Sequence, residues 1–76
     1  MIIYNTKQEA YAKAMEIKRK HSDAEIGESE ITFGGNDKDG KFIEKTYPTI
    51  EVWYERYDQV EGWMDCTAVL IYRTNE

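Results

Sequence analysis

Two periodicities of apolar side chains divide the chain, and they predict a helix followed by strands. In residues 7–21, apolar side chains recur every three or four positions, which is the spacing of one helix face. Thr6 and Glu9 form a capping-box pattern, so we expect the helix to run from near Lys7 to near His21. The stripe on its buried side consists of Ala10, Ala14, Ile17 and His21, widened by Tyr11 and Met15.

From residue 25 onward, apolar and polar side chains alternate with a period of two, which predicts β-strands. Pro48 cannot donate a ladder hydrogen bond, so it marks a bulge, an edge or a break that would split the third strand. We expect a single α+β domain over residues 1–76 with the order β-α-β-β-β, in which one helix packs on one face of an antiparallel sheet of about three to five strands. The expected strands cover residues 1–4, 25–33, 41–47, 49–57 and 63–74.

A glycine-rich loop shares its spacing with two kinds of ligand-binding loop. Gly35, Gly40 and Lys41 are spaced as in a phosphate-binding loop, but Phe42 stands where that loop needs Ser or Thr, and strand-like residues follow instead of a helix. A calcium loop with Gly40 in its sixth place would need carboxylates where Gly35 and Thr46 stand. Neither pattern is complete.

We therefore expect this loop to be a turn. Its small residues supply the positive φ angles that a chain reversal needs, and they are Gly34, Gly35, Asn36 and Gly40. A weak cation site formed by Asp37, Asp39 and the Asn36 carbonyl stays open as an alternative.

The side chains best suited to catalysis are few. His21 is the only histidine and completes the helix stripe, whereas Cys66 is the only cysteine and shares strand parity with Met64, Ala68 and Leu70. We expect Cys66 to be a small buried hydrophobe, and two such ligands are too few for a tetrahedral zinc site. The sequence therefore predicts no enzyme, no metal and no cofactor.

Cysteine content and hydropathy predict a cytoplasmic protein. A lone cysteine cannot form an internal disulfide, and we expect no signal peptide because no basic leader precedes a long apolar run. The longest apolar run, residues 68–72, is too short to cross a bilayer.

The formal net charge is −5, and the charged residues are unevenly distributed along the chain. Residues 1–21 hold five bases and two acids, whereas residues 22–76 hold five bases and thirteen acids. The acidic part repels phosphate, so we expect no direct nucleic-acid binding and no membrane binding. It is suited to meeting a basic protein surface.

Strand parity predicts a sheet with two apolar faces, of which a single helix can cover only one. Ile50, Val52 and Tyr54 share one face, and the opposite face mixes aromatic rings with acids. Exposed apolar patches of this kind mark interfaces, in which Trp and Tyr dominate the binding energy. The candidate partner-binding residues are Glu51, Trp53, Glu55, Tyr57, Trp63 and Asp65, with Val69 and Ile71 beside them.

These features favour a small acidic protein-binding module, an inhibitor or regulator that docks on a basic surface of a larger protein, such as a nucleic-acid-binding groove. Phage proteins that block host defence and bacterial immunity proteins are the analogous class, and strand carboxylates can take the places of phosphates. The alternative is a structural or assembly protein, a homodimer joined through the open sheet face or an edge strand. A ligand carrier or small enzyme built on carboxylates and tyrosines is a third class.

A purely structural explanation of the same residues also stands. Aromatic rings pair across strands for stability, and strong sheet curvature would let Val69 and Ile71 pack internally. The acids would then only keep the domain soluble.

Overall fold

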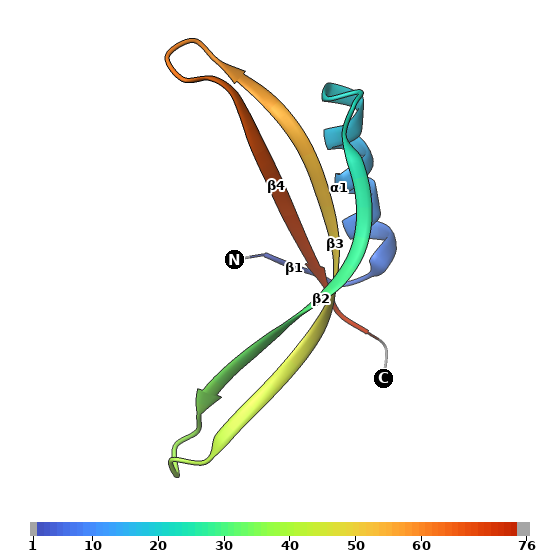
Figure 1. The fold of residues 1–76 in the computed structure, drawn as a ribbon. Coiled ribbons are helices and arrows are strands. Elements are labelled where there is room, and N and C mark those ends of the chain that lie inside the picture. The colour runs from blue at the N-terminus through green and yellow to red at the C-terminus, as the bar shows by residue number, and fades with distance from the viewer. Residues whose placement is uncertain (1, 75–76) are drawn as a thin grey trace.

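A helix lies against a four-stranded mixed sheet in the computed structural model, which describes residues 2–74 (Figure 1). The strands lie side by side in the order β1-β4-β3-β2. This arrangement confirms the α+β class. In chain order the elements are β1 (Ile3–Tyr4), α1 (Lys7–Lys20), β2 (Glu25–Asn36), β3 (Phe42–Asp58) and β4 (Gly62–Tyr72).

The sheet is only partly antiparallel, which corrects the expectation of a wholly antiparallel sheet. β2 pairs antiparallel with β3, and β3 pairs antiparallel with β4, but β1 pairs parallel with β4 through Ile3 opposite Ile71. The chain returns through α1 between β1 and β2, and the two hairpins that follow give β4 the direction of β1. A two-residue strand has no periodicity from which this pairing could be predicted.

The boundaries of α1 follow from its two ends. The Thr6 hydroxyl accepts a hydrogen bond from the Glu9 amide at 3.2 Å, which satisfies one of the free donors of the first turn. At the other end the His21 amide donates to the Ile17 carbonyl, and His21 caps the helix. The predicted limits are confirmed. No helix within residues 2–74 is long and apolar enough to span a membrane.

The core forms where small helix residues let α1 approach the sheet closely. Ala10 and Ala14 are fully buried, as the stripe predicted, whereas Tyr11 is exposed and does not widen it. Tyr4, Ile17 and Ile26 pack at the margin of this core. The sheet contributes Ile50, Val52, Leu70 and Tyr72, and Ala24 joins them from the connection before β2.

β3 runs without a break through Pro48, so the expected split of this strand is wrong. Pro48 lies opposite Glu30 of β2, and the pairing of β3 with β4 begins only at the next residue, Thr49 opposite Ile71. Proline is tolerated because β3 has no neighbour on the β4 side at this point. Pro48 thus marks the end of a ladder, not the end of a strand.

Both hairpin turns use an aspartate as an internal cap. The Asp37 carboxylate accepts from the amides of Asp39 and Lys41, each at 2.9 Å, and Gly40 follows with a φ of 79°. The Asp58 carboxylate accepts from Val60 and Glu61 at 2.8 and 3.1 Å, and a glycine with a φ of 81° again closes the turn. The glycine-rich loop is therefore a turn, as predicted.

The positive φ angles in this loop are fewer than expected. Gly40 has one, but Gly34, Gly35 and Asn36 are extended residues of β2. Gly34 remains important because the ring of Phe42 lies over it, and an added Cβ would come within 2.8 Å of that ring. β2 is therefore longer than predicted and continues through both glycines to Asn36, with Phe42 covering Gly34 alone.

The two hairpins extend in opposite directions beyond α1 (Figure 1). The described chain measures 50 × 29 × 16 Å along its principal axes, so it is long and thin for its size. Cross-strand pairs support the β2–β3 hairpin, including the Thr32 and Thr46 hydroxyls at 2.8 Å and the edge-to-face rings of Phe33 and Tyr47. Neither hairpin end has helix cover.

The close approach of α1 predicts a large penalty for added volume at Ala14. Ala14→Leu should lower the free energy of unfolding by about 1–3 kcal/mol, because the added carbons have no space between helix and sheet. Urea denaturation measures this. Ala12→Leu is the matched control, since Ala12 is exposed on the same helix and its replacement should change stability by less than about 0.5 kcal/mol. Equal losses in both variants would contradict this packing.

The Asp58 turn predicts an acid-dependent loss of stability. Hydrogen bonds from the Val60 and Glu61 amides hold the pKa of the Asp58 carboxyl below its ordinary value. The stabilisation is therefore present above the ordinary pKa and is lost as the pH falls through the lowered folded-state pKa. NMR titration should show the Val60 and Glu61 amide shifts following a midpoint below the ordinary aspartate value. Asp58→Asn should abolish that titration, and a midpoint at or above the ordinary value would contradict the capping role.

Candidate functional site: an acidic and aromatic sheet face

The six predicted partner-binding residues lie on one face of the β3–β4 hairpin, opposite α1. Tyr57 pairs directly with Trp63, and Glu55 pairs directly with Asp65, so each pair shares a face. Trp53 and Glu51 follow on the same side of β3. We call this surface the open face, and it consists of Glu25, Glu51, Trp53, Glu55, Tyr57, Trp63, Asp65 and Val69.

The outer part of the open face carries a pair of exposed rings. Tyr57 and Trp63 meet edge to face with their centroids 5.5 Å apart, yet they remain 60% and 70% exposed. They lie at the β3–β4 hairpin, beyond the end of the core. Cross-strand packing therefore accounts for the orientation of these rings but leaves most of their surface in water.

Trp53 occupies the middle of the open face and is positioned by a glycine. Its ring lies over Gly27 of β2, where an added Cβ would come within 2.6 Å of the indole. Gly27 pairs with Glu51, the next residue on the same face, so the indole reaches diagonally across to β2. Trp53 is held against the sheet and is still 42% exposed.

The inner part of this face is buried. Ile71 is only 4% exposed and Thr49 only 1%, although both lie on the side away from α1. Val69, two residues from Ile71, stays 45% exposed. Internal packing thus holds for Ile71 and not for Val69, and the open face begins where this burial ends.

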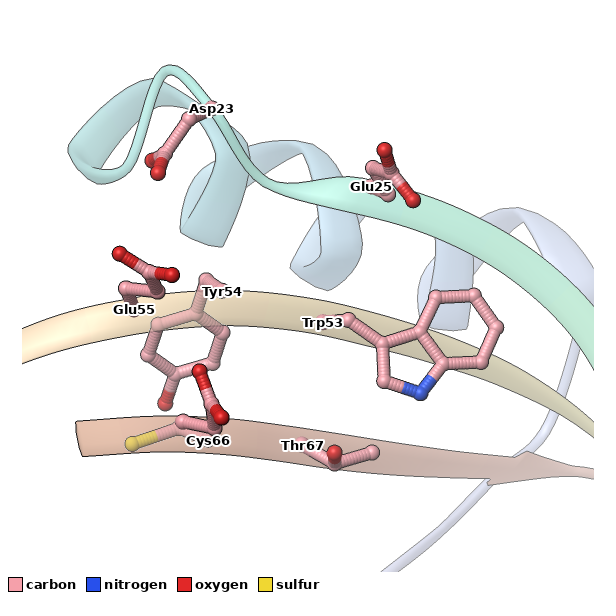
Figure 2. Close-up of a pocket in the computed structure, with 8 residues that line it drawn as sticks. Asp23, Glu25, Trp53, Tyr54, Glu55, Cys66 and Thr67 are labelled. Carbon is pink, nitrogen blue, oxygen red and sulfur yellow. The ribbon is translucent and has the colours of Figure 1, made fainter.

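A shallow groove of about 410 Å³ runs along the edge of β3 at the margin of the open face (Figure 2). It exists because β2 begins at Glu25, opposite Trp53, and leaves the rest of β3 without a neighbour on that side. Carboxylates from three elements and the preceding connection surround Trp53 and Tyr54, and no basic side chain lines the groove. The acids are Asp23, Glu25, Glu55 and Asp65.

Asp23 and Glu25 were not predicted as site residues. They become part of the groove only through the pairing of Glu25 with Trp53, which strand parity alone does not give. The sequence signal that could have identified them is the tight turn at Gly40. Counting residues back from that turn along both strands gives the register of β2 on β3, in which Glu25 lies opposite Trp53.

Like charges lie directly opposite each other in the centre of the open face. Glu55 and Asp65 are cross-strand partners, an arrangement that destabilises a sheet. The ion pairs within residues 2–74 lie elsewhere: Lys7 with Glu28, and Lys13 and Lys20 with Glu16. The Glu28 carboxylate accepts from Lys7 at 2.6 Å and raises the pKa of that ammonium group.

The remaining candidate side chains contact neighbouring residues of the fold. The His21 ring stacks on Tyr54 with centroids 4.5 Å apart, and the Cys66 thiol points toward the Met64 carbonyl at 3.9 Å. Cys66 is only half-buried, less than predicted. One oxygen of the Asp37 carboxylate, Oδ1, accepts from both turn amides, and residues 2–74 bring together no group of three side chains that could hold a metal ion.

Comparisons with protein-family models, with curated proteins and with solved structures find no match to this chain. The geometry and charge of the open face therefore carry the functional inference.

The contact between Gly27 and Trp53 predicts that a single methyl group rearranges the site. Gly27→Ala should displace the indole from the sheet, because the new Cβ would overlap it. In a Trp63→Phe background, Trp53 emission should shift to the red and acrylamide should quench it faster. Gly35→Ala is the matched control, since no atom lies within 4 Å of that Cβ position. Identical spectra for both variants would show that Gly27 does not position Trp53.

Proposed function

We propose that this protein is a small acidic binding module that docks its open face on a basic surface of a larger protein and thereby inhibits or regulates it. The observation that carries the proposal is the alternation of exposed rings and carboxylates on a sheet face that α1 does not cover, beside a groove that no basic side chain lines. In this proposal the protein is not an enzyme, needs no cofactor and acts in the cytoplasm.

Aromatic anchors supply most of the binding energy in such a role. Trp53, Tyr57 and Trp63 project from adjacent strands with large exposed areas, and they are already ordered by Gly27 and by their own edge-to-face contact. Rings held in place lose little conformational entropy on binding. A buried anchor of this type contributes about 2 kcal/mol or more.

The carboxylates select the partner by charge. Asp23, Glu25, Glu55 and Asp65 make the groove uniformly acidic, which favours encounter with a basic surface and disfavours acidic partners. Acids spaced along neighbouring strands can occupy places that phosphates take on a nucleic-acid-binding protein. This is the basis for proposing an anti-defence or immunity-like inhibitor, such as phages and bacteria use.

The opposed acids also favour a binding role over a purely solubilising one. Solubility would be served equally by acids placed apart, whereas Glu55 opposite Asp65 weakens the hairpin that presents the rings. A basic side chain from a partner would relieve that repulsion on binding. Local rules of stability are most often broken at functional sites.

Variants of Glu55 should move stability and binding in opposite directions. Glu55→Lys would face Asp65 with an opposite charge, so the free energy of unfolding should rise by roughly 0.2–1 kcal/mol. Affinity capture from the native host at low and high salt would supply the partner, and calorimetry with that partner should show binding weakened by Glu55→Lys and by added salt. Trp53→Ala should lower the affinity about 30-fold.

Two exposed residues away from the open face provide matched controls. Tyr11→Ala removes an exposed ring from α1, and Glu30→Lys reverses a charge on the opposite side of the sheet. Both should leave partner affinity unchanged. Unchanged affinity in Trp53→Ala and Glu55→Lys, or losses of equal size in the controls, would rule out docking through this face.

A further inference from the structure

We infer that the free edge of β4 pairs with the β4 edge of a second copy of this chain, antiparallel and centred on Cys66. β1 covers β4 only at Ile71 and Tyr72. The remainder of that edge, Gly62–Leu70, has no neighbouring strand within residues 2–74. Unlike the docking of a basic partner, this association uses backbone groups at the edge of the sheet.

The backbone direction along this edge is set by one hydrogen bond. The Arg73 amide donates to the Tyr4 carbonyl of β1 at 2.9 Å, so the backbone N–H of Arg73 points away from β3. In a strand, the backbone N–H and C=O groups of every second residue point toward the same edge. The odd-numbered residues of β4 therefore present these groups at the free edge. Within the uncovered segment these residues are Trp63, Asp65, Thr67 and Val69.

Two independent restrictions select a single register. Pairing the whole free segment, Gly62–Leu70, with itself places its midpoint, Cys66, on the two-fold axis. In this register Asp65 faces Thr67 of the second copy. A shift that centred the pairing on Asp65 would oppose two carboxylates, and a shift centred on Thr67 would require Ile71, which β1 already occupies.

The side chains at this edge complement themselves. The register places Trp63 opposite Val69 of the second copy, an aromatic and β-branched pair of the kind that stabilises sheets, and both side chains are exposed in the single chain. Four hydrogen-bonded residue pairs give about eight new backbone hydrogen bonds. Asp65 is the only charged residue of β4, so little repulsion opposes the pairing.

The opposite edge of the sheet differs in each of these respects. β2 is the other edge strand, and it carries Glu25, Glu28 and Glu30, which disfavour pairing with an identical strand. Its three glycines further weaken a ladder. The contrast between a charged edge and a nearly neutral one indicates that β4 is the edge open to association.

The paired form has a defined geometry. Antiparallel pairing about a two-fold axis places equivalent faces on the same side, so the two open faces would form one continuous surface. Cys66 then faces Cys66 of the second copy as a non-hydrogen-bonded pair, with Cα atoms about 4.5 Å apart, which is within the range of a disulfide. Formation of a disulfide between the two Cys66 thiols therefore tests the register.

Charge changes at Thr67 test the register directly, because Thr67 faces Asp65 of the second copy twice in each dimer. Thr67→Asp should raise the dimer dissociation constant about tenfold, and Thr67→Lys should lower it by a similar factor. Sedimentation velocity over a concentration series measures both. Thr74→Asp adds the same charge at an exposed position beyond β4 and should change the dissociation constant little.

Oxidation of Cys66 provides a second readout. Diamide should convert two Cys66 thiols of a dimer to one disulfide while it is reduced to the hydrazine, and the rate should follow the order Thr67→Lys, wild type, Thr67→Asp. Cys66→Ser should give no covalent dimer. A wild type that stays monomeric at every concentration, or a dimer that is indifferent to charge at Thr67, would overturn the inference.

The same experiments separate this inference from the proposed function. A monomeric wild type that binds its basic partner through Trp53 would remove the dimer and leave docking in place. If the dimer depends on Thr67 but no partner binding depends on Trp53, the β4 dimer stands and the docking proposal is removed. A dimer weakened by Trp53→Ala and unaffected at Thr67 would use the open face instead and would overturn β4 pairing.

Discussion

The mismatch in length between helix and strands governs this molecule. α1 has 14 residues and spans about 21 Å, whereas β3 has 17 residues and would extend about 56 Å. Only the part of the sheet beneath Ala10 and Ala14 can therefore be buried as a core. The hairpin ends lie outside it, and their cross-strand pairs and aspartate-capped turns must hold them in shape.

The two hairpins differ in the side-chain contacts that they make across their strands. The β2–β3 hairpin joins hydroxyls and rings across its strands, and Lys45 lies over the Tyr47 ring. The β3–β4 hairpin instead brings Glu55 against Asp65. Exposed rings occur at both ends, since Phe42 of the β2–β3 hairpin is as exposed as Tyr57. The opposed acids at the second of two otherwise similar hairpins are the reason for proposing that it, and not the first, docks on a partner.

Local signals in the sequence predicted local structure well. Thr6 and Glu9 located the helix start, the alanine stripe identified the buried side of α1, and parity placed Trp53 and Glu55 together. These features depend on residues close in the chain. The predictions failed where distant segments decide the outcome, as in the parallel pairing of Ile3 with Ile71.

The other differences have the same origin. Pro48 fits within β3 because β4 stops beside it, and Ile71 is buried although parity places it on the side away from α1. Glu25 enters the groove through its pairing with Trp53. Pattern assigns a side chain to a face, but twist and register determine whether that face is covered.

The attachment of β1 also has a consequence for motion. β1 is held to β4 by two residue pairs between segments far apart in the sequence, whereas β2, β3 and β4 are linked by consecutive hairpins. Short segments with few contacts open at lower free energy than the rest of a fold, so amide protons of β1 should exchange with solvent before those of the hairpins. Detachment of β1 would free all eleven residues of β4 as a template for another strand.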